Sequence, residues 1–223
     1  QYYNNPNNVE SAYISADKFQ YYDRNRLIQI SGDWYLDDER LVIFSGIDFA
    51  FSLSAKADYT AIVTVGVNRR GQMFVLDIDR FKTNKISVMF DKVLTAYRKW
   101  GFRKLRAEVT VAQALIVTQF KDYMRQNNCS FSIDEHRPVR NKEERIRASL
   151  EPRYSNGVMW HYKGGNCQTL EEELIVEHPE HDDIKDCLAS VLDIVVVPSN
   201  KTRTVSSSSQ PIYNNRFGGV TYA

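Results

Sequence analysis

The most constraining feature of this sequence is a nearly continuous apolar run, residues 41–47, that ends directly in an aspartate. The run reads Leu-Val-Ile-Phe-Ser-Gly-Ile, Asp48 follows it, and Phe49 and Ala50 come next. Such a run is typical of a strand that is covered on both faces. A carboxylate this deep in apolar sequence is costly to bury unless something compensates its charge. The run therefore predicts a central buried strand with a functional acid at its end.

The segments that follow predict a mixed sheet with helices packed on it. Residues 59–67 and 72–78 are two strand-like runs, and the turn at 68–71 between them predicts a hairpin. Apolar side chains recur at helical spacing over 86–100, and Gly101 ends that helix. We expect a strand at 104–109, a helix at 112–126, a strand at 131–133, a helix from a capping box at Asn141 and Glu144 to about residue 150, and a last helix over 183–195. This order indicates an α/β fold.

Three zones of the chain differ in character. Residues 1–40 are rich in Tyr, Asn and Gln with weak periodicity, and we expect an N-terminal arm or interdomain linker there. Residues 41–198 carry the strong structural signals and predict one domain. Residues 199–223 form a polar tail that is too poor in apolar groups to hold a core. Because the chain begins at Gln1 without a signal segment, we expect a piece of a longer protein.

Composition excludes some classes of protein. No stretch approaches the ~20 apolar residues that span a bilayer. The three cysteines, Cys129, Cys167 and Cys187, show no CxxC spacing, so neither a disulfide framework nor a structural zinc site is expected, and a reducing cytoplasm is indicated. A net charge of +1 argues against a protein that coats nucleic acid indiscriminately. It remains compatible with an enzyme that has a basic surface and an acidic site.

Two further acidic positions lie, like Asp48, at the end or the start of a predicted element. Glu108 stands near the end of the strand at 104–109, and an acidic turn, His-Asp-Asp-Ile-Lys-Asp over residues 181–186, opens the last helix. Mg²⁺ prefers carboxylate oxygens, and a two-metal site needs several of them around ions about 3.5–4 Å apart. Convergence of these acids would support phosphodiester hydrolysis, in which one ion activates water and the other stabilises the leaving oxygen.

Helical geometry ranks the acids of the last helix. At about 100° per residue, Asp183 lies nearest the sheet-facing edge, Asp186 lies on its side one turn on, and Asp182 is the weakest candidate. The alternative for each is an acid favoured by the helix dipole alone, and we prefer that interpretation for Asp182. Glu108 taken alone is also compatible with an ordinary surface acid on an edge strand.

In this order, the acidic motifs resemble the nuclease domain of the large terminases of tailed bacteriophages. The stretch 46–50 (Gly-Ile-Asp-Phe-Ala) with 57–61 (Ala-Asp-Tyr-Thr-Ala) resembles the family's first acidic motif, and 107–110 (Ala-Glu-Val-Thr) is similar to the second. Residues 181–189 resemble the third, with Cys187 where alanine is common. Residues 140–157 are similar to the segment between the second and third motifs, so the resemblance spans about 41–198.

The resemblance implies a ribonuclease H-like fold and a metal-dependent endonuclease that cuts concatemeric double-stranded viral DNA during packaging. It implies two Mg²⁺ or Mn²⁺ ions held by Asp48, Glu108 and Asp183, with Asp186 as a fourth ligand and Asp58 and Asp182 as accessory acids. Expected partners are DNA, the ATPase domain of the same full-length protein, the portal and the small terminase subunit. The expected location is the cytoplasm of the infected host, transiently at the procapsid portal.

Basic residues cluster between the second and third motifs. Lys142 and Arg145, three residues apart, are the preferred DNA contacts, together with Arg140, because phosphate contacts give affinity without sequence selectivity. The alternative is a solvated helix face that Glu143, Glu144 and Glu151 balance.

Other functions stay open at this point. One is a resolvase-like or repair nuclease on the same fold, and another is a catalytically silent domain that docks DNA or the portal. The sequence contains no Gly-x-x-x-x-Gly-Lys-Ser/Thr phosphate loop, so ATP hydrolysis by this chain is not expected.

Overall fold

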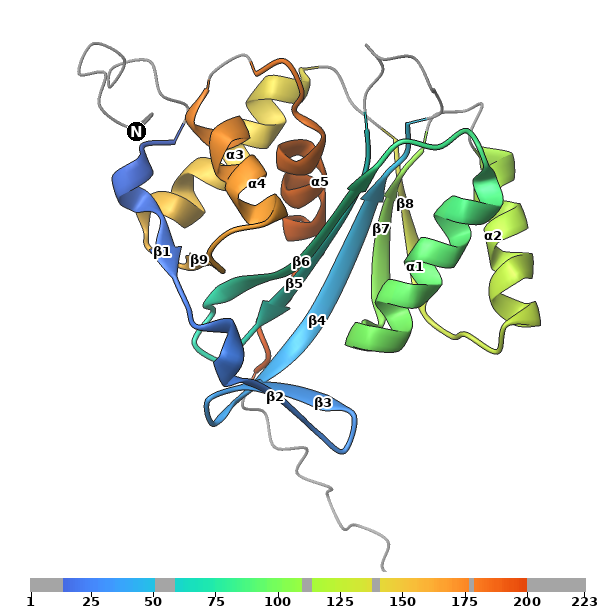
Figure 1. Cartoon of the computed structure of the whole chain (residues 1–223), viewed down its shortest axis with the longest axis horizontal. Coiled ribbons are helices and arrows are strands. Elements are labelled where there is room, and N and C mark those ends of the chain that lie inside the picture. The colour runs from blue at the N-terminus through green and yellow to red at the C-terminus, as the bar shows by residue number, and fades with distance from the viewer. Residues whose placement is uncertain (1–13, 51–58, 110–113, 138–140, 177–178, 200–223) are drawn as a thin grey trace, which may run out of the picture.

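The computed structural model describes residues 14–50, 59–109, 114–137, 141–176 and 179–199. Nine strands form one mixed sheet, in the order β1-β9-β6-β5-β4-β3-β2, with β7 paired to β4 and β8 to β7 (Figure 1). The strands are β1 (Gln20–Tyr21), β2 (Leu27–Ile30), β3 (Asp33–Leu36), β4 (Glu39–Asp48), β5 (Thr60–Val67), β6 (Met73–Phe81), β7 (Lys104–Glu108), β8 (Ser132–His136) and β9 (Met159–His161).

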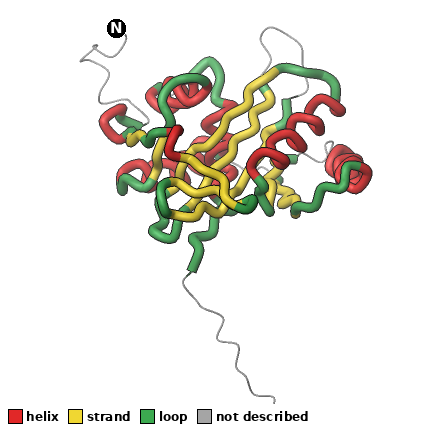
Figure 2. The backbone as a smooth tube through the Cα atoms, turned by 60° about the horizontal axis from the view of Figure 1, so that its bottom comes forward, coloured by secondary structure: helices red, strands yellow, loops and turns green. Residues whose placement is uncertain are grey.

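Helices cover both faces of this sheet. The helices α1 (Ile86–Trp100) and α2 (Ala114–Gln126) lie on one side, and α3 (Lys142–Ser155), α4 (Asn166–Ile175) and α5 (Asp183–Leu192) lie on the other (Figure 1). Figure 2 shows the sheet between these layers. Two short 3-10 turns, η2 (Ala16–Lys18) and η3 (Arg24–Arg26), flank β1. The expected α/β fold, a mixed sheet flanked by helices, is confirmed.

The strand β4 is the centre of the sheet, as its apolar run predicts. It pairs antiparallel with β5 and parallel with β7. Gly46 faces α5 so closely that an added Cβ would lie 2.4 Å from Val191 Cγ2. The absence of a side chain at this position therefore brings α5, which carries the third acidic motif, directly onto β4.

The helix α5 is buried along its whole length. Its apolar side chains Ile184, Leu188 and Val191 belong to the core, and burial of each contributes about 1.5–3 kcal/mol. The Sγ of Cys187 also donates to the backbone oxygen of Ala61 in β5 at 3.4 Å. These contacts fix the start of α5 against the ends of β4 and β5.

Several expectations about local structure are confirmed. The helix α1 ends at Gly101, which has a φ of 66° and donates its N–H to the oxygen of Tyr97 at 2.8 Å. The hairpin between β5 and β6 turns at residues 68–71, where Gly71 donates to Asn68. Both glycines have a positive φ, which other residues adopt only with strain.

Other expectations differ from the structure. Asn141 precedes α3 with a φ of 73° and makes no side-chain cap bond, so the capping box does not form, and α3 continues to Ser155. Within the segment assigned to an arm, β1 pairs with β9 and the β2–β3 hairpin extends β4, so the sheet crosses the expected boundary at residue 40. The elements β9 and α4 were not predicted. The tail from residue 200 onward lies outside the described residues.

None of the helices in the described part of the chain combines the length and apolar character that a bilayer crossing needs.

Candidate active site

Two of the predicted acids are direct neighbours at one end of the sheet. The parallel strands β4 and β7 pair so that Asp48 lies opposite Glu108. The side chain of Glu108 is 15% exposed. Neighbouring residues in register on parallel strands point to the same face, so both carboxylates face the side that α3 and α5 cover. The sequence could predict each acid separately, and the strand register brings them together.

The start of α5 adds further acids at this end. Asp182 is the N-cap residue, and Asp183 and Asp186 lie in the first turn, where they are 3% and 2% exposed. Asp183 is held through both oxygens: Oδ1 accepts from the backbone N–H of Tyr59 at 3.1 Å, and Oδ2 accepts from Arg80 at 3.3 Å. Asp182 is more exposed, with 37% of its side chain accessible.

Two cations of α3 reach into this acidic group. The Nη2 nitrogen of Arg145 lies 3.3 Å from Glu108 Oε2 and also donates to Asp186 Oδ1. The Nζ of Lys142 lies 3.0 Å from Asp186 Oδ2 and 3.1 Å from Asp182 Oδ2. The preferred DNA contacts of the sequence therefore contact the acids in this structure. Arg140 lies outside the described residues.

The acids repel one another strongly. Burial raises the pKa of Asp48 to about 8, and the negative charges of Asp186 and Glu108 add to the effect. Burial and Asp186 likewise raise the pKa of Glu108. Burial alone would lower the pKa of Lys142, but Asp186 and Asp182 outweigh it, so that pKa is raised and Lys142 stays charged.

The chemistry of this donor set fits divalent metal ions, although among the described residues no three of these acids bring their oxygens within 4.8 Å of one another. All of the acids offer carboxylate oxygens, which Mg²⁺ and Mn²⁺ prefer, and a dication would relieve the repulsion that raises the pKa of Asp48 and Glu108. Asp48, Glu108, Asp183 and Asp186 would hold such ions. Bound ions would supply an activated water and stabilise the charge on a leaving oxygen. Asp58, an expected accessory acid, lies outside the described residues.

Three polar residues near these acids were not singled out in the sequence. His136 ends β8 opposite Glu108 in register, its Nε2 is buried without a hydrogen-bond partner among the described residues, and burial next to Arg106 and Arg145 lowers its pKa. Arg80 in β6 lies 3.3 Å from Asp183, and Glu173 in α4 lies 3.9 Å from Arg80. The strand expected at 131–133 stopped short of His136, and no sequence pattern indicated Arg80 or Glu173.

A second group of ligand-type side chains lies apart from this site. Across the described residues, the one set of three whose donor atoms all lie within 4.8 Å of one another is His161, Cys167 and Glu171. His161 uses both ring nitrogens already, Nδ1 with Glu171 at 2.9 Å and Nε2 with the Tyr154 hydroxyl at 2.7 Å. Burial also raises the pKa of Cys167 to about 12, which keeps it a thiol. This group therefore fits a buried polar network better than a metal site.

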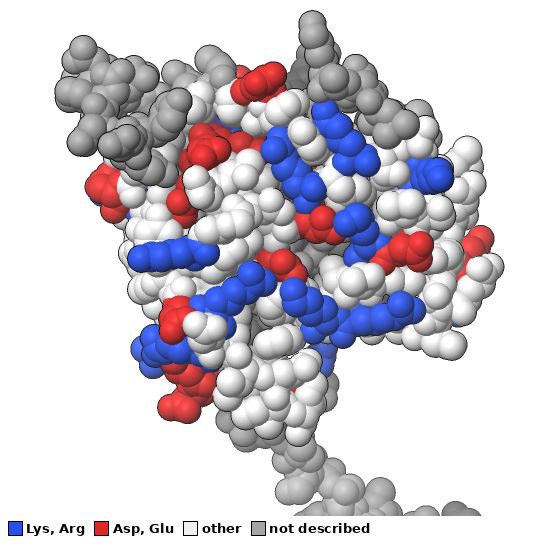
Figure 3. Space-filling view, viewed as in Figure 1, with Lys and Arg blue, Asp and Glu red and all other residues white. Residues whose placement is uncertain are grey.

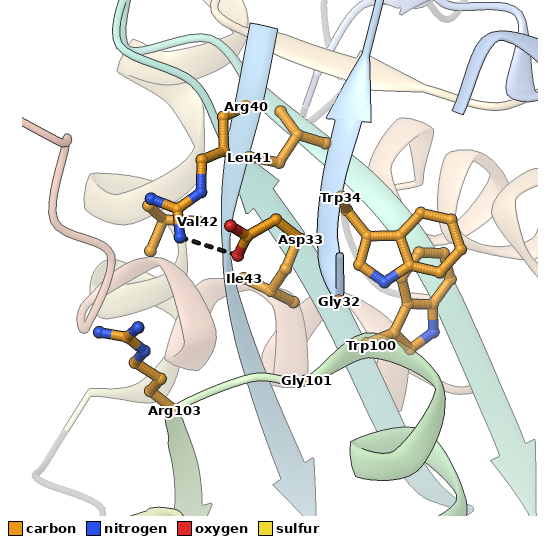
Figure 4. Close-up of a pocket in the computed structure, with 10 residues that line it drawn as sticks. All are labelled: Gly32, Asp33, Trp34, Arg40, Leu41, Val42, Ile43, Trp100, Gly101 and Arg103. Atoms are coloured by element: carbon orange, nitrogen blue, oxygen red, sulfur yellow. Dashed lines mark hydrogen bonds and ion pairs between the residues drawn. The ribbon is translucent and has the colours of Figure 1, made fainter. Parts of the chain in front are cut away.

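A small pocket of about 100 Å³ lies at the opposite end of β4 (Figure 4). Arg40 and Arg103 point toward it from one side, with Arg40 paired to Asp33 at 2.8 Å. Trp34 packs on Trp100 with ring centroids 4.7 Å apart, which docks the β2–β3 hairpin on the end of α1. Because the acids lie at the other end of β4, this pocket is not part of the candidate active site.

The face seen in Figure 3 mixes charges of both signs. Lys and Arg side chains alternate there with Asp and Glu and form no continuous basic field, in keeping with the net charge of +1.

Comparisons with known proteins support this architecture. Residues 54–158 match the family described as "Terminase Bacteriophage T7, Ribonuclease H-like domain". The crystal structure of the large terminase nuclease from thermophilic phage G20c is similar with a TM-score of 0.51 at 12% identity, over 81% of this chain and 96% of that one. No curated protein matches the chain in sequence.

The crystal structure of the HK97 bacteriophage large terminase is similar with a TM-score of 0.54, also at 12% identity. The match covers 83% of this chain and 44% of the HK97 chain, so this chain spans less than half of that protein. At 12% identity these two structures support only the fold, whereas the family match is a similarity in sequence. Residues 54–158 of this chain are therefore similar in sequence to the ribonuclease H-like domain of a phage terminase, and the two solved structures support a ribonuclease H-like fold.

Proposed function

We propose that this domain is a Mg²⁺- or Mn²⁺-dependent endonuclease that cuts double-stranded, concatemeric viral DNA during genome packaging. The observation that carries the proposal is the pairing of Asp48 with Glu108 at the ends of β4 and β7, next to the buried acids of α5. Two ions held by Asp48, Glu108, Asp183 and Asp186 would support in-line hydrolysis of a phosphodiester. The terminase relatives, named for a nuclease and for a large terminase, support this class of substrate.

The basic residues of α3 have a defined place in this proposal. Lys142 and Arg145 neutralise the acids in the structure. Bound dications would take over that neutralisation, and the two side chains, with Arg140, would then be available to phosphates of the DNA backbone. The same proposal places the domain in the cytoplasm of an infected bacterium, with the ATPase domain of the full-length protein, the portal and the small terminase subunit as partners.

A plasmid-nicking assay tests the proposal. The wild-type chain should nick and linearise supercoiled DNA with Mg²⁺ or Mn²⁺, and Asp48→Asn and Glu108→Gln should abolish cutting while the fold survives. Asp122→Asn is the matched control, because Asp122 is an exposed acid of α2 that pairs with Arg125, and this variant should cut normally. Undiminished cutting in excess EDTA would exclude the metal mechanism.

Two other functions predict different results. A resolvase-like or repair nuclease would cut branched or damaged DNA much faster than a linear duplex. A catalytically silent docking domain would bind DNA or the portal equally well as wild type and as Asp48→Asn, without cutting. The buried carboxylates argue against the silent domain, because repulsive acids at this position weaken the fold unless they serve a ligand.

A further inference from the structure

Asp183 is surrounded by a frame of three residues from separate segments: Tyr59 before β5, Arg80 in β6 and Glu173 in α4. Its Oδ1 accepts from the backbone N–H of Tyr59, which leads into β5, and its Oδ2 accepts from Arg80 in β6. Arg80 also faces Glu173 of α4, with Nη2 3.9 Å from Oε1. The side chains of Arg80, Glu173 and Asp183 are 16%, 5% and 4% exposed, so the frame is largely removed from solvent.

The frame extends from the side chains to the backbone of α5. The other oxygen of Glu173, Oε2, accepts from the backbone N–H of Lys185 at 2.8 Å. Glu173 thus accepts a hydrogen bond from the first turn of α5 through Oε2 and lies at ion-pair distance from Arg80 through Oε1. Asp183 begins that turn, so Glu173 fixes the helix that carries it and Arg80 contacts its carboxylate.

Arg80 is in turn held in place by an aromatic ring. Its guanidinium carbon lies 3.8 Å from the centre of the Tyr59 ring, whose neighbour Lys82 has its Nζ 4.3 Å from the same centre. The guanidinium stacks on the ring, and its Nη2 nitrogen faces both carboxylates, Asp183 at 3.3 Å and Glu173 at 3.9 Å. A lysine at position 80 would keep the charge but lack the flat group that stacks on the ring.

We propose that Arg80 is a positioning residue that holds Asp183 in the orientation in which it binds metal, with Glu173 as its fixed counter-ion. This inference rests on the proposed metal-dependent nuclease. Partners that orient a metal ligand are worth about 10- to 100-fold in metal affinity or activity. Both carboxylate oxygens of Asp183 are held in this way, one by a backbone N–H and one by Arg80, so the direction of this carboxylate is fixed.

The charge of Arg80 and its orienting contact with Asp183 should have opposite effects on metal affinity. A lone cation next to Asp183 would compete with a metal ion, so its removal would tighten metal binding. Glu173 lies 3.9 Å from this guanidinium and offsets its charge when it is ionised, so we expect the orienting effect to dominate. Glu173→Gln should therefore weaken metal binding, because it leaves Arg80 unbalanced while the glutamine oxygen can still accept from Lys185.

Titration calorimetry with Mn²⁺ and nicking assays over a range of Mn²⁺ concentrations test this inference. Arg80→Met should weaken Mn²⁺ binding about 10- to 100-fold and slow cutting at saturating Mn²⁺. The double variant Arg80→Met/Glu173→Gln, which restores neutrality without geometry, should stay defective. Arg70→Met is the matched control, because Arg70 is an exposed arginine paired with Glu39, and it should behave as wild type.

The outcomes separate this inference from the function on which it rests. If Arg80→Met binds Mn²⁺ as well as wild type, or if the double variant recovers full affinity, Arg80 is only a counter-ion and the inference is overturned. If wild type itself neither binds Mn²⁺ nor cuts DNA, the proposed function and the inference fall together. Should Arg80→Met fail to fold, Arg80→Lys keeps the charge next to Glu173, and wild-type Mn²⁺ affinity in that variant would equally overturn the positioning role of the stacked guanidinium.

Discussion

Arg145 donates a hydrogen bond to Asp186, so a cation of the chain itself neutralises an acid that we propose as a metal ligand. The same Nη2 nitrogen lies 3.3 Å from Glu108 Oε2. A metal ion that binds these carboxylates must compete with the guanidinium. Metal affinity and the stability of the metal-free domain are therefore coupled through Arg145.

Replacement of Arg145 by methionine should change these two quantities in opposite directions. Without metal, the melting temperature should fall, because Asp186 and Glu108 lose a buried partner, which costs about 3 kcal/mol or more in buried pairs. The rise in melting temperature on adding Mg²⁺ should become larger than in wild type, because the competitor is gone. Thermal melts with EDTA and with Mg²⁺ measure both effects. Arg147→Met, at an exposed position of the same helix, is the control, and an unchanged Mg²⁺ effect in Arg145→Met would contradict the competition.

The raised pKa of Asp48 predicts how stability depends on pH. Its pKa is about 8 in the folded chain, against 3.8 for the unperturbed group, so between these values the folded state binds more protons than the unfolded state. The metal-free domain should therefore lose stability as pH rises from about 4 toward 8. Asp48→Asn removes this contribution, so it should flatten the slope and raise the melting temperature near pH 8. A slope equal to that of wild type would show that Asp48 is ionised at neutral pH.

Gly46 predicts a packing effect that reaches the active site. A methyl group at this position would lie 2.4 Å from Val191 Cγ2, so Gly46→Ala should destabilise the domain by about 1–3 kcal/mol. It should also reduce cutting, because α5 would move away from Asp48. The double variant Gly46→Ala/Val191→Ala should lose less stability than the sum of the single variants, which chemical denaturation measures. Strict additivity would mean that the two residues do not meet.

The central strand and its acid could be predicted because their signals are local. An apolar run that ends in a carboxylate identifies β4 and Asp48 within ten residues of sequence. The short strands β1 and β9, of two and three residues, carry no periodicity and depend on partners far along the chain. The contacts of Arg80 are equally remote, since Asp183 lies 103 residues away in sequence.

The sequence also could not predict which side of α3 faces the acids. Lys142 and Arg145 could be recognised as neighbours on one side of a helix, but the sequence does not say what that side faces. Packing decides it, because Ile146 is buried in the core and Ser149 donates to the oxygen of Ala189 in α5 at 3.2 Å. That contact turns the basic side of α3 toward the acids.

The acids of α5 allow a ranking that separates metal ligands from an acid that only opens a helix. Helical geometry favoured Asp183, and the structure buries Asp183 and Asp186 while Asp182 stays partly exposed and paired with Lys142. Asp186 also contributes more than Asp183 to the raised pKa of Asp48, which places it as a ligand candidate of at least equal weight.

We therefore expect Asp183→Asn and Asp186→Asn each to reduce cutting by 100-fold or more, on the order of 3 kcal/mol in the barrier, and Asp182→Asn to reduce it by less than about 10-fold. Single-turnover cutting at saturating Mn²⁺ measures the three variants, with circular dichroism as the check on folding. A fully active Asp183→Asn beside an inactive Asp182→Asn would reverse the ranking and assign the ligand role to the N-cap residue.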